Sequence, residues 1–230
     1  MKTIAIIPAR GGSRRIPRKN IRLFCGKPII YYPIATALES GLFDEVMVST
    51  DDQEIADVAI QGGAKVPFLR SAMTSNDTAV TAAVISEVMH RYLENGVEFD
   101  KLCCIYPVTP LLRAKHLKGA VALLEAENVE SVQPVVRFSF PPQRAVRVLP
   151  DGRVSWIFPE HALTRSQDLE AQYHDVGQFY WWKTVHFLKQ KLLVGQNSFA
   201  YEMSELDIQD IDNEVDWQLA EQKYRLRFAE

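Results

Sequence analysis

Six basic residues and two glycines lie close together near the N-terminus, in the sequence PARGGSRRIPRKNIR at 8–22. No carboxylate accompanies them, although the whole chain carries a net charge of −3. Gly11 and Gly12 lack a Cβ, so their backbone N–H groups can approach an anion closely. Arg10 and Lys19 can pair with phosphate oxygens, and Ser13 can donate its hydroxyl. The pattern predicts a loop that binds phosphate groups.

Two alternatives to phosphate binding remain open for this basic loop. It could be a solvated turn, or an arm that binds nucleic acid. The net charge of −3 argues against a general nucleic-acid-binding protein, which usually carries a basic excess. The motifs G-x-x-x-x-G-K-[ST] and G-x-G-x-x-G are both absent, which weakens a hydrolase of the P-loop type and a dinucleotide-binding dehydrogenase.

Acidic residues gather near the other end of the chain, in LDIQDIDNEVDW at 206–217. Asp210 and Asp212 are two apart, so in an extended segment both carboxylates would point to the same side. Two convergent carboxylates suit Mg²⁺, which takes hard oxygen ligands beside water and substrate phosphates. The alternative is helix capping by Asp212 or Asn213, with the following carboxylates favouring the positive end of the helix. Both interpretations can hold together.

The elements that must position these clusters alternate between strand and helix in the first half of the chain. Short apolar runs predict strands at 3–7, 46–49, 65–69 and 102–106. Helical patterns with caps and stops lie at 27–40, 52–61, 77–93 and 115–127. This succession predicts an α/β fold with a doubly wound, mostly parallel sheet. Ligands of such sheets bind beyond the carboxyl ends of strands, so the loops after Ile7, Thr50 and Tyr106 are candidate site loops.

The pattern changes near Ser131. Runs at 144–149 and 153–158 flank Pro150-Asp151-Gly152, which predicts a β-hairpin. Apolar residues on this protruding hairpin, such as Val148 and Trp156, favour a homodimer. Strands at 177–182 and 198–203 and a closing helix at 214–228 complete the prediction of one domain at 1–230. Within it, 131–176 forms an excursion from the main sheet that serves dimerisation.

The bulk composition is that of a soluble globular protein, with 47% hydrophobic and 24% charged residues in 230. Cys25, Cys103 and Cys104 form no C-x-x-C pair and no even-numbered framework. We therefore expect reduced thiols and a cytoplasmic protein. The N-terminal apolar run is too short for a signal peptide, and no run is long enough to span a membrane.

Four segments together resemble the CMP-sugar synthetase family, the cytidylyltransferases that activate sialic acids and related nonulosonic acids. PARGGSRRIPRKNI resembles the nucleotide-binding motif of that family, and VSTDD at 48–52 resembles its second strand and turn. RSAMTSNDTAV at 70–80 is similar to the stretch beside the cytidine, and DIDNEVD at 210–216 to the metal-binding segment. The similarity covers essentially the whole chain and implies a Rossmann-like nucleotidyltransferase.

Two further segments resemble the branch of the family that acts on pseudaminic acid: FSFPPQRAVRV at 138–148 and TRSQDLEAQYHDVGQFYWW at 164–182. There are two departures. Tyr106 stands where sialic acid synthetases typically have Gln, and near the place of an acidic metal ligand in enzymes for Kdo, so metal binding must depend on Asp210 and Asp212 or on the triphosphate. Trp182 stands where a small residue is more usual.

The resemblance implies transfer of CMP from CTP to the anomeric hydroxyl of a nine-carbon acidic sugar, pseudaminic acid first, with Mg²⁺ as cofactor. Legionaminic and sialic acid are alternative sugars, and a nucleotide- or RNA-binding module without catalysis is an alternative of another class. The expected partners are CTP, the acidic sugar and a second copy of the chain, without nucleic acid or membrane.

Expected catalytic residues are Arg10, Lys19, Asp210 and Asp212, the last two also binding the metal. Expected nucleotide-binding residues are Ala9, Arg10, Gly11, Gly12, Ser13, Lys19, Asn20, Arg70, Asp77 and Thr78. Expected sugar-binding residues are Arg165, for the substrate carboxylate, and Gln167, Tyr173, His174 and Gln178, so the resemblance also places part of the sugar site on the excursion at 131–176.

Overall fold

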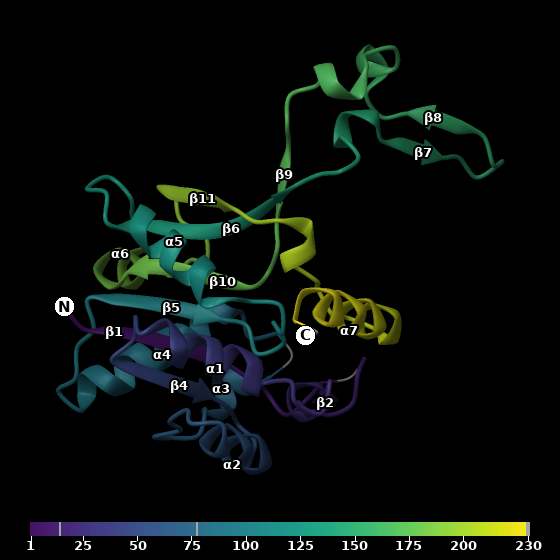
Figure 1. Cartoon of the computed structure of the whole chain (residues 1–230). Coiled ribbons are helices and arrows are strands. Elements are labelled where there is room, and N and C mark those ends of the chain that lie inside the picture. Colours follow the sequence, from purple (N-terminus) through teal and green to yellow (C-terminus); the bar gives the residue numbers. More distant parts are fainter. Residues whose placement is uncertain (14, 77, 229–230) are drawn as a thin grey trace.

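The computed structural model describes residues 1–13, 15–76 and 78–228 and is built around a seven-stranded sheet (Figure 1). The order of the strands is β11-β6-β10-β5-β1-β4, with β9 paired to β6 beside this path. β1 is parallel to both β4 and β5, and β11 is parallel to β6, whereas β10 is antiparallel to both of its neighbours. The predicted mostly parallel sheet is therefore confirmed. The strands are β1 (Thr3–Pro8), β4 (Glu45–Ser49), β5 (Lys101–Ile105), β6 (Ser131–Arg137), β9 (Tyr173–Asp175), β10 (Phe179–Lys183) and β11 (Ser198–Glu202).

Helices cover both faces of the sheet because its central strands bury side chains on both sides. Along β1, Ala5 and Ile7 pack into a core with α1 and α5, whereas Ile4 and Ile6 pack into a second core with α4 and α6. The helices are α1 (Tyr31–Ser40), α2 (Gln53–Gln61), α3 (Ala72–Ser75), α4 (Thr81–Glu94), α5 (Ala114–Leu124), α6 (Thr184–Gln190) and α7 (Glu214–Phe228). Among the described residues, no helix is both long and apolar enough to cross a membrane.

Three predicted elements differ in the structure. The run at 65–69 forms only an isolated bridge between Lys65 and Met47, because Pro67 has no N–H to continue a ladder. The first helix begins at Tyr31 rather than at Lys27. The preceding residues form β3 (Lys27–Pro28), which pairs with β2 (Leu23–Phe24) through a turn at Cys25 and Gly26 with φ of 44° and 90°. The helix predicted at 77–93 begins at Thr81. Asp77, predicted as its cap, lies outside the described residues.

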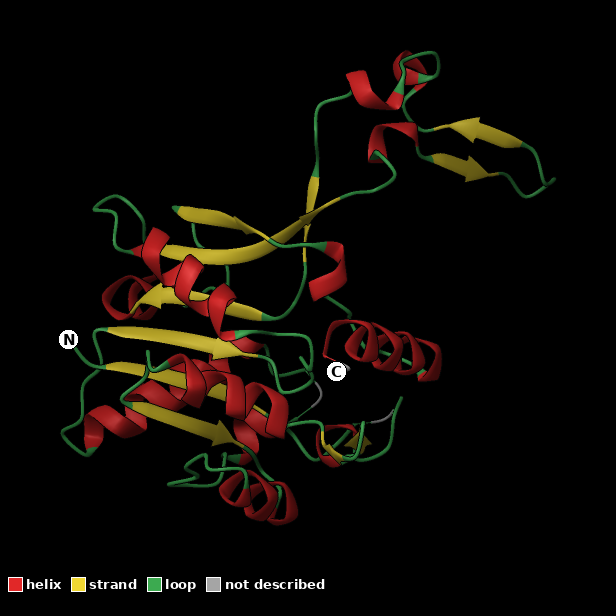
Figure 2. Cartoon of the chain, viewed as in Figure 1, coloured by secondary structure: helices red, strands yellow, loops and turns green. Residues whose placement is uncertain are grey.

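Between β6 and β9 the chain leaves the main sheet and projects from the body of the molecule (Figure 1). This arm, defined here as 138–172, is narrower than the expected excursion at 131–176, because both flanking strands belong to the main sheet. The predicted hairpin is confirmed as β7 (Val146–Val148) and β8 (Val154–Trp156), which form a separate small sheet (Figure 2). Short 3₁₀ turns at η2 (Pro142–Arg144), η3 (Pro159–His161) and η4 (Ser166–Asp168) complete the arm.

Candidate active site

The basic loop and the acidic segment face the same cleft, which has a volume of about 730 Å³. It opens beyond the carboxyl ends of β1 and β5, where a doubly wound sheet is expected to bind its ligand. Arg10, Ser13 and Lys19 line it from the loop after β1, and Asp210 and Ile211 line it from the segment before α7. The two predicted clusters, distant in the sequence, are therefore brought together by the fold.

The turn after β4 holds the basic loop in place. The Gly11 N–H donates to Asp51 Oδ1 at 3.0 Å, and the Arg18 guanidinium donates to Asp52 at 2.5 and 2.9 Å. Asp52 also caps α2 through the Ile55 N–H, and the neighbouring Arg18 lowers the pKa of its carboxyl below the usual range. The sequence did not reveal that Arg18 binds Asp52. In the structure this side chain holds the loop in place and does not line the cleft.

Gly11 is required by this packing, because a Cβ added there would lie 2.8 Å from Asp52 Oδ2. A Cβ at Gly12 would meet nothing within 4 Å. We expect Gly11→Ala to lower the free energy of unfolding by about 1–3 kcal/mol, the usual cost of overpacking. Gly12→Ala is the matched control and should lower it by less than about 1 kcal/mol. Urea unfolding without ligand measures both, and equal losses would contradict a special role for Gly11.

The acidic segment touches the basic loop directly. The Lys19 ammonium donates to the Ile211 carbonyl at 2.6 Å and lies 3.9 Å from the Asp212 carboxylate. Arg15, exposed beside them, pairs with Asp212 at 2.7 Å. The Ile211 side chain is buried and anchors the segment in an apolar cluster with Trp217 of α7. Burial lowers the pKa of Lys19, and the attraction of Asp212 opposes that shift.

Helix capping explains part of the acidic cluster. The Asn213 side chain accepts the N–H groups of Val215 and Asp216, and the Asp216 carboxylate accepts those of Asp212 and Asn213. This reciprocal capping box starts α7. The capping interpretation therefore holds for Asn213 and Asp216. The carboxylates of Asp210 and Asp212 take no part in this capping: Asp212 pairs with Arg15, and Asp210 faces the cleft.

The two remaining carboxylates fit a Mg²⁺ site that substrate completes. Asp210 faces the cleft, and partial desolvation, with the nearby Asp212 charge, raises the pKa of its carboxyl. A cation beside the pair would relieve both effects. Within 1–13, 15–76 and 78–228, no group of three or more His, Cys, Asp or Glu side chains could hold a metal. Mg²⁺ is commonly held by one or two carboxylates plus substrate phosphates, so this donor set is sufficient.

The opposite wall of the cleft is formed by the segment around α3 and by the loop after β5. Arg70 is buried and donates to the Ser49 carbonyl at 2.5 Å, so it fastens this wall to the end of β4. Tyr106 lines the cleft, with its hydroxyl 3.2 Å from that of Thr81. Thr78 is exposed and bonds to the Asn76 side chain, which itself lines the cleft. Asp77 lies outside the described residues.

Sequence reasoning missed several residues of the cleft. Four of them share an uncharged, hydrogen-bonding or small character that no charge pattern reveals: Thr74, Asn76, Thr81 and Gly177. The loop after Tyr106 was a candidate site loop, but Tyr106 itself was not among the expected site residues, although it directly follows β5. Of the expected nucleotide-binding residues, Asn20 lines the cleft and donates to the Arg10 carbonyl at 2.9 Å, whereas Ala9 is buried below it.

Comparison with known proteins agrees with this geometry. A family model described as Cytidylyltransferase matches residues 4–174. The chain belongs to the cytidylyltransferase family. It is thus a CTP-dependent nucleotidyltransferase, as the resemblance implied.

The cytidylyltransferase has relatives along its whole length. It is 38% identical to the pseudaminic acid cytidylyltransferase of Campylobacter jejuni, an alignment that covers 98% of this chain and 97% of that one. It is 32% identical to the CMP-N,N'-diacetyllegionaminic acid synthase of Legionella pneumophila, with the same coverage. The solved structure of a CMP:2-keto-3-deoxy-manno-octonic acid synthetase has the same fold, with a TM-score of 0.73 at 18% identity over 99% of this chain and 100% of that one.

The five expected sugar-binding residues of the cytidylyltransferase lie outside the nucleotide cleft of the chain. On the arm, Arg165 pairs with Asp168 at 2.7 Å, and Gln167 lines a separate cavity of about 580 Å³. Tyr173 and His174 are exposed on β9. Gln178 is buried and donates to the Asp207 carbonyl at 3.0 Å, although its neighbour Gly177 does line the cleft. A single chain therefore does not bring these five residues into the cleft lined by Arg10, Lys19 and Asp210.

Proposed function

We propose that this enzyme transfers CMP from CTP to the anomeric hydroxyl of pseudaminic acid and releases pyrophosphate. The observation that carries the proposal is the shared cleft, in which Lys19 joins the basic loop to the carbonyl between Asp210 and Asp212. The choice of sugar is supported by the 38% identity to a pseudaminic acid cytidylyltransferase and by the segments at 138–148 and 164–182.

In the proposed reaction a bond forms between the anomeric oxygen and the α-phosphorus, while the bond from that phosphorus to the pyrophosphate oxygen breaks. The hydroxyl loses its proton and pyrophosphate departs. Arg10, Lys19 and the Ser13 hydroxyl hold the triphosphate and neutralise the departing charge, which is worth most in a preorganised cleft. Mg²⁺ held by Asp210 and Asp212 would add charge neutralisation at the α-phosphate.

The test is pyrophosphate release from CTP and Mg²⁺ with a panel of acidic sugars. We expect kcat/KM to be highest for pseudaminic acid, with little release from legionaminic acid, sialic acid or buffer alone. A higher kcat/KM for legionaminic or sialic acid would keep the reaction and replace the sugar. Salt-dependent RNA binding without pyrophosphate release from any sugar would favour the binding-module alternative.

We also propose that the enzyme is a cytoplasmic homodimer assembled through the arm. The hairpin presents Val148 and Val154 with 72% and 64% of their surface exposed, and Trp156 and Phe158 lie beside them, also exposed. Contiguous apolar surface on a projecting element favours burial against another chain. A partner's arm could then bring sugar-binding residues to the cleft. Three free cysteines, two of them buried, support the reducing location.

The dimer is tested by a Val148→Asp, Trp156→Asp double variant. We expect it to sediment mainly as a monomer, because two charges would be buried at the contact. Val185→Asp is the control, since Val185 is 69% exposed on α6, away from the arm. A double variant that remains dimeric to the same extent as the control would remove the hairpin from the interface.

A further inference from the structure

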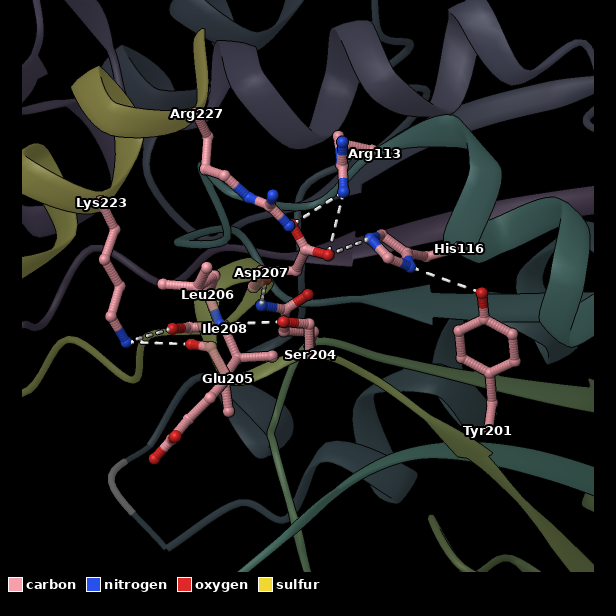
Figure 3. Close-up of polar contacts among 11 residues, drawn as sticks. Arg113, His116, Tyr201, Ser204, Glu205, Leu206, Asp207, Ile208, Lys223 and Arg227 are labelled. Atoms are coloured by element: carbon pink, nitrogen blue, oxygen red, sulfur yellow. Dashed lines mark hydrogen bonds and ion pairs between the residues drawn. The ribbon is translucent and has the colours of Figure 1, made fainter. Parts of the chain in front are cut away.

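A second charged cluster, in which basic side chains surround the Asp207 carboxylate, lies outside the cleft (Figure 3). Asp207 ends η5 (Glu205–Asp207), and only 3% of its surface is exposed. Its carboxylate accepts hydrogen bonds from Arg113 at 2.9 Å and from Arg227 at 2.6 Å. Arg113 precedes α5 and Arg227 lies in the last turn of α7, so the carboxylate joins two helices that are far apart in the sequence.

The third neighbour of Asp207 is His116 of α5, whose Nε2 lies 3.4 Å from the carboxylate. Burial lowers the pKa of His116 to about 4, so the ring is neutral at physiological pH and the contact is not an ion pair. The charge of Asp207 is therefore balanced by the two arginines. Hydrogen bonds between arginine and carboxylate fix direction as well as distance.

The backbone on either side of Asp207 is also held. Lys223 of α7 donates to the carbonyls of Glu205 at 3.1 Å and Ile208 at 2.9 Å (Figure 3). Gln178, immediately before β10, donates to the Asp207 carbonyl at 3.0 Å. The upstream end of the acidic segment is thus tied both to α7 and to the central sheet.

The downstream end is fixed separately, by the capping box of Asn213 and Asp216 and by the buried Ile211. From 207 to 213 the chain covers at most roughly 20 Å when extended. α7 then returns over 15 residues, or about 22 Å. These lengths match, and Arg227 closes the loop by meeting Asp207. Asp210 and Asp212 lie on the span between the two fixed ends.

We propose that Asp207 is a positioning residue: held by Arg113 and Arg227, it sets the place and direction of the Asp210 carboxylate in the cleft and of the Asp212 carboxylate beside Lys19. Asp207 does not line the cleft, and it acts through the backbone that links it to Asp210 and Asp212. A buried ion pair is a poor way to add stability, since its desolvation cost offsets its attraction. A role in fixing the direction of the following segment therefore explains the ion pairs of Asp207 with Arg113 and Arg227 better than a stabilising role does. The inference rests on the proposed metal-binding role of Asp210 and Asp212.

The test measures the affinity of the enzyme for Mn²⁺ in the presence of CTP, by electron paramagnetic resonance of the free ion. We expect Asp207→Asn and Arg227→Gln to weaken Mn²⁺ binding about ten-fold or more, as is usual for residues that orient ligands. We also expect kcat to fall by a similar factor while the KM for CTP changes little. Arg225→Gln is the matched control: it removes the same charge from α7, but Arg225 pairs only weakly with Glu221 at the surface, at 3.4 Å.

Arg227→Gln decides the matter if Asp207→Asn does not fold, because Arg113 still binds the carboxylate in that variant. Arg227→Lys should recover part of the Mn²⁺ affinity, since it restores charge without the planar fork. Folded Arg227→Gln enzyme with wild-type Mn²⁺ affinity and kcat would overturn the positioning role. Unchanged Mn²⁺ affinity in Asp210→Asn would instead show that the proposed metal ligands are wrong, whatever Asp207 does.

Discussion

Replacing Asp210 by Asn is expected to lower kcat for Mg²⁺-dependent pyrophosphate release by about a thousand-fold or more. A loss of that size corresponds to about 4 kcal/mol of transition-state stabilisation, within the range of a removed metal contact. The physical reason is that the triphosphate and Asp210 are both negative, so a divalent cation held by Asp210 would remove their repulsion and neutralise charge on the phosphates. Asp212→Asn should have an effect in the same direction. Pyrophosphate release at saturating CTP and sugar measures both.

The fold should survive the Asp210 substitution. Burial and the neighbouring Asp212 raise the pKa of Asp210, so its ionised form destabilises the folded chain. Stability from this group is therefore lost as the pH rises through its unfolded and then its folded pKa, and Asn removes that loss at neutral pH. Glu214→Gln is the matched control: it removes one charge from the same segment, but Glu214 pairs with Arg22 away from the cleft. Wild-type turnover in the Asp210 variant would disprove the metal assignment.

The parallel core of the fold was predictable because its signals are local. Each central strand is a short apolar run, and Asp52 and Gly41 mark helix ends with side-chain and backbone chemistry that acts within a few residues. The strands β6 and β9 were missed because their pairing is decided by distant partners. β6 contains Pro134, which weakens a strand prediction, and β9 has only three residues.

The two charged clusters were also predictable, but their division of labour was not. Of the basic loop, Arg18 and Arg22 hold Asp52 and Glu214, whereas Arg10, Arg15 and Lys19 line the cleft. Sequence spacing cannot separate these groups, since their partners are about 30 to 190 residues away. Similarly, the close packing of Gly11 against Asp52 could not be predicted from the sequence, and its approach to a phosphate stays a prediction.

The sugar side illustrates a different limit. Arg165 and Gln167 were chosen by resemblance to a segment of related sequences, and the fold carries that segment onto the arm, away from the triphosphate cleft. The substrate carboxylate calls for a cationic side chain, but this requirement does not say whether the same chain or a partner chain supplies it. Their role stays a prediction, and it depends on the proposed assembly through the hairpin.

Replacing Lys19 by Ala is expected to lower kcat/KM for CTP by about thirty- to a hundred-fold. The estimate follows from a charged hydrogen bond worth about 2–3 kcal/mol in a partly desolvated site. Lys19 lines the cleft, donates to the Ile211 carbonyl and lies 3.9 Å from Asp212. Its removal therefore takes one positive charge from the triphosphate and one support from the acidic segment. Initial rates over a range of CTP concentrations measure the loss.

Two variants separate these contributions. Lys19→Arg keeps the charge but replaces a compact ammonium by a wide planar group, so it should retain CTP binding better than turnover. Lys65→Ala is the control for a lost surface lysine, because Lys65 pairs with Glu45 at 2.9 Å outside the cleft. A fall in the free energy of unfolding without any change in kcat/KM would show that Lys19 stabilises the fold and does not contribute to the reaction. If kcat/KM falls and CTP no longer raises the Tm of the variant, the Lys19 ammonium binds the triphosphate.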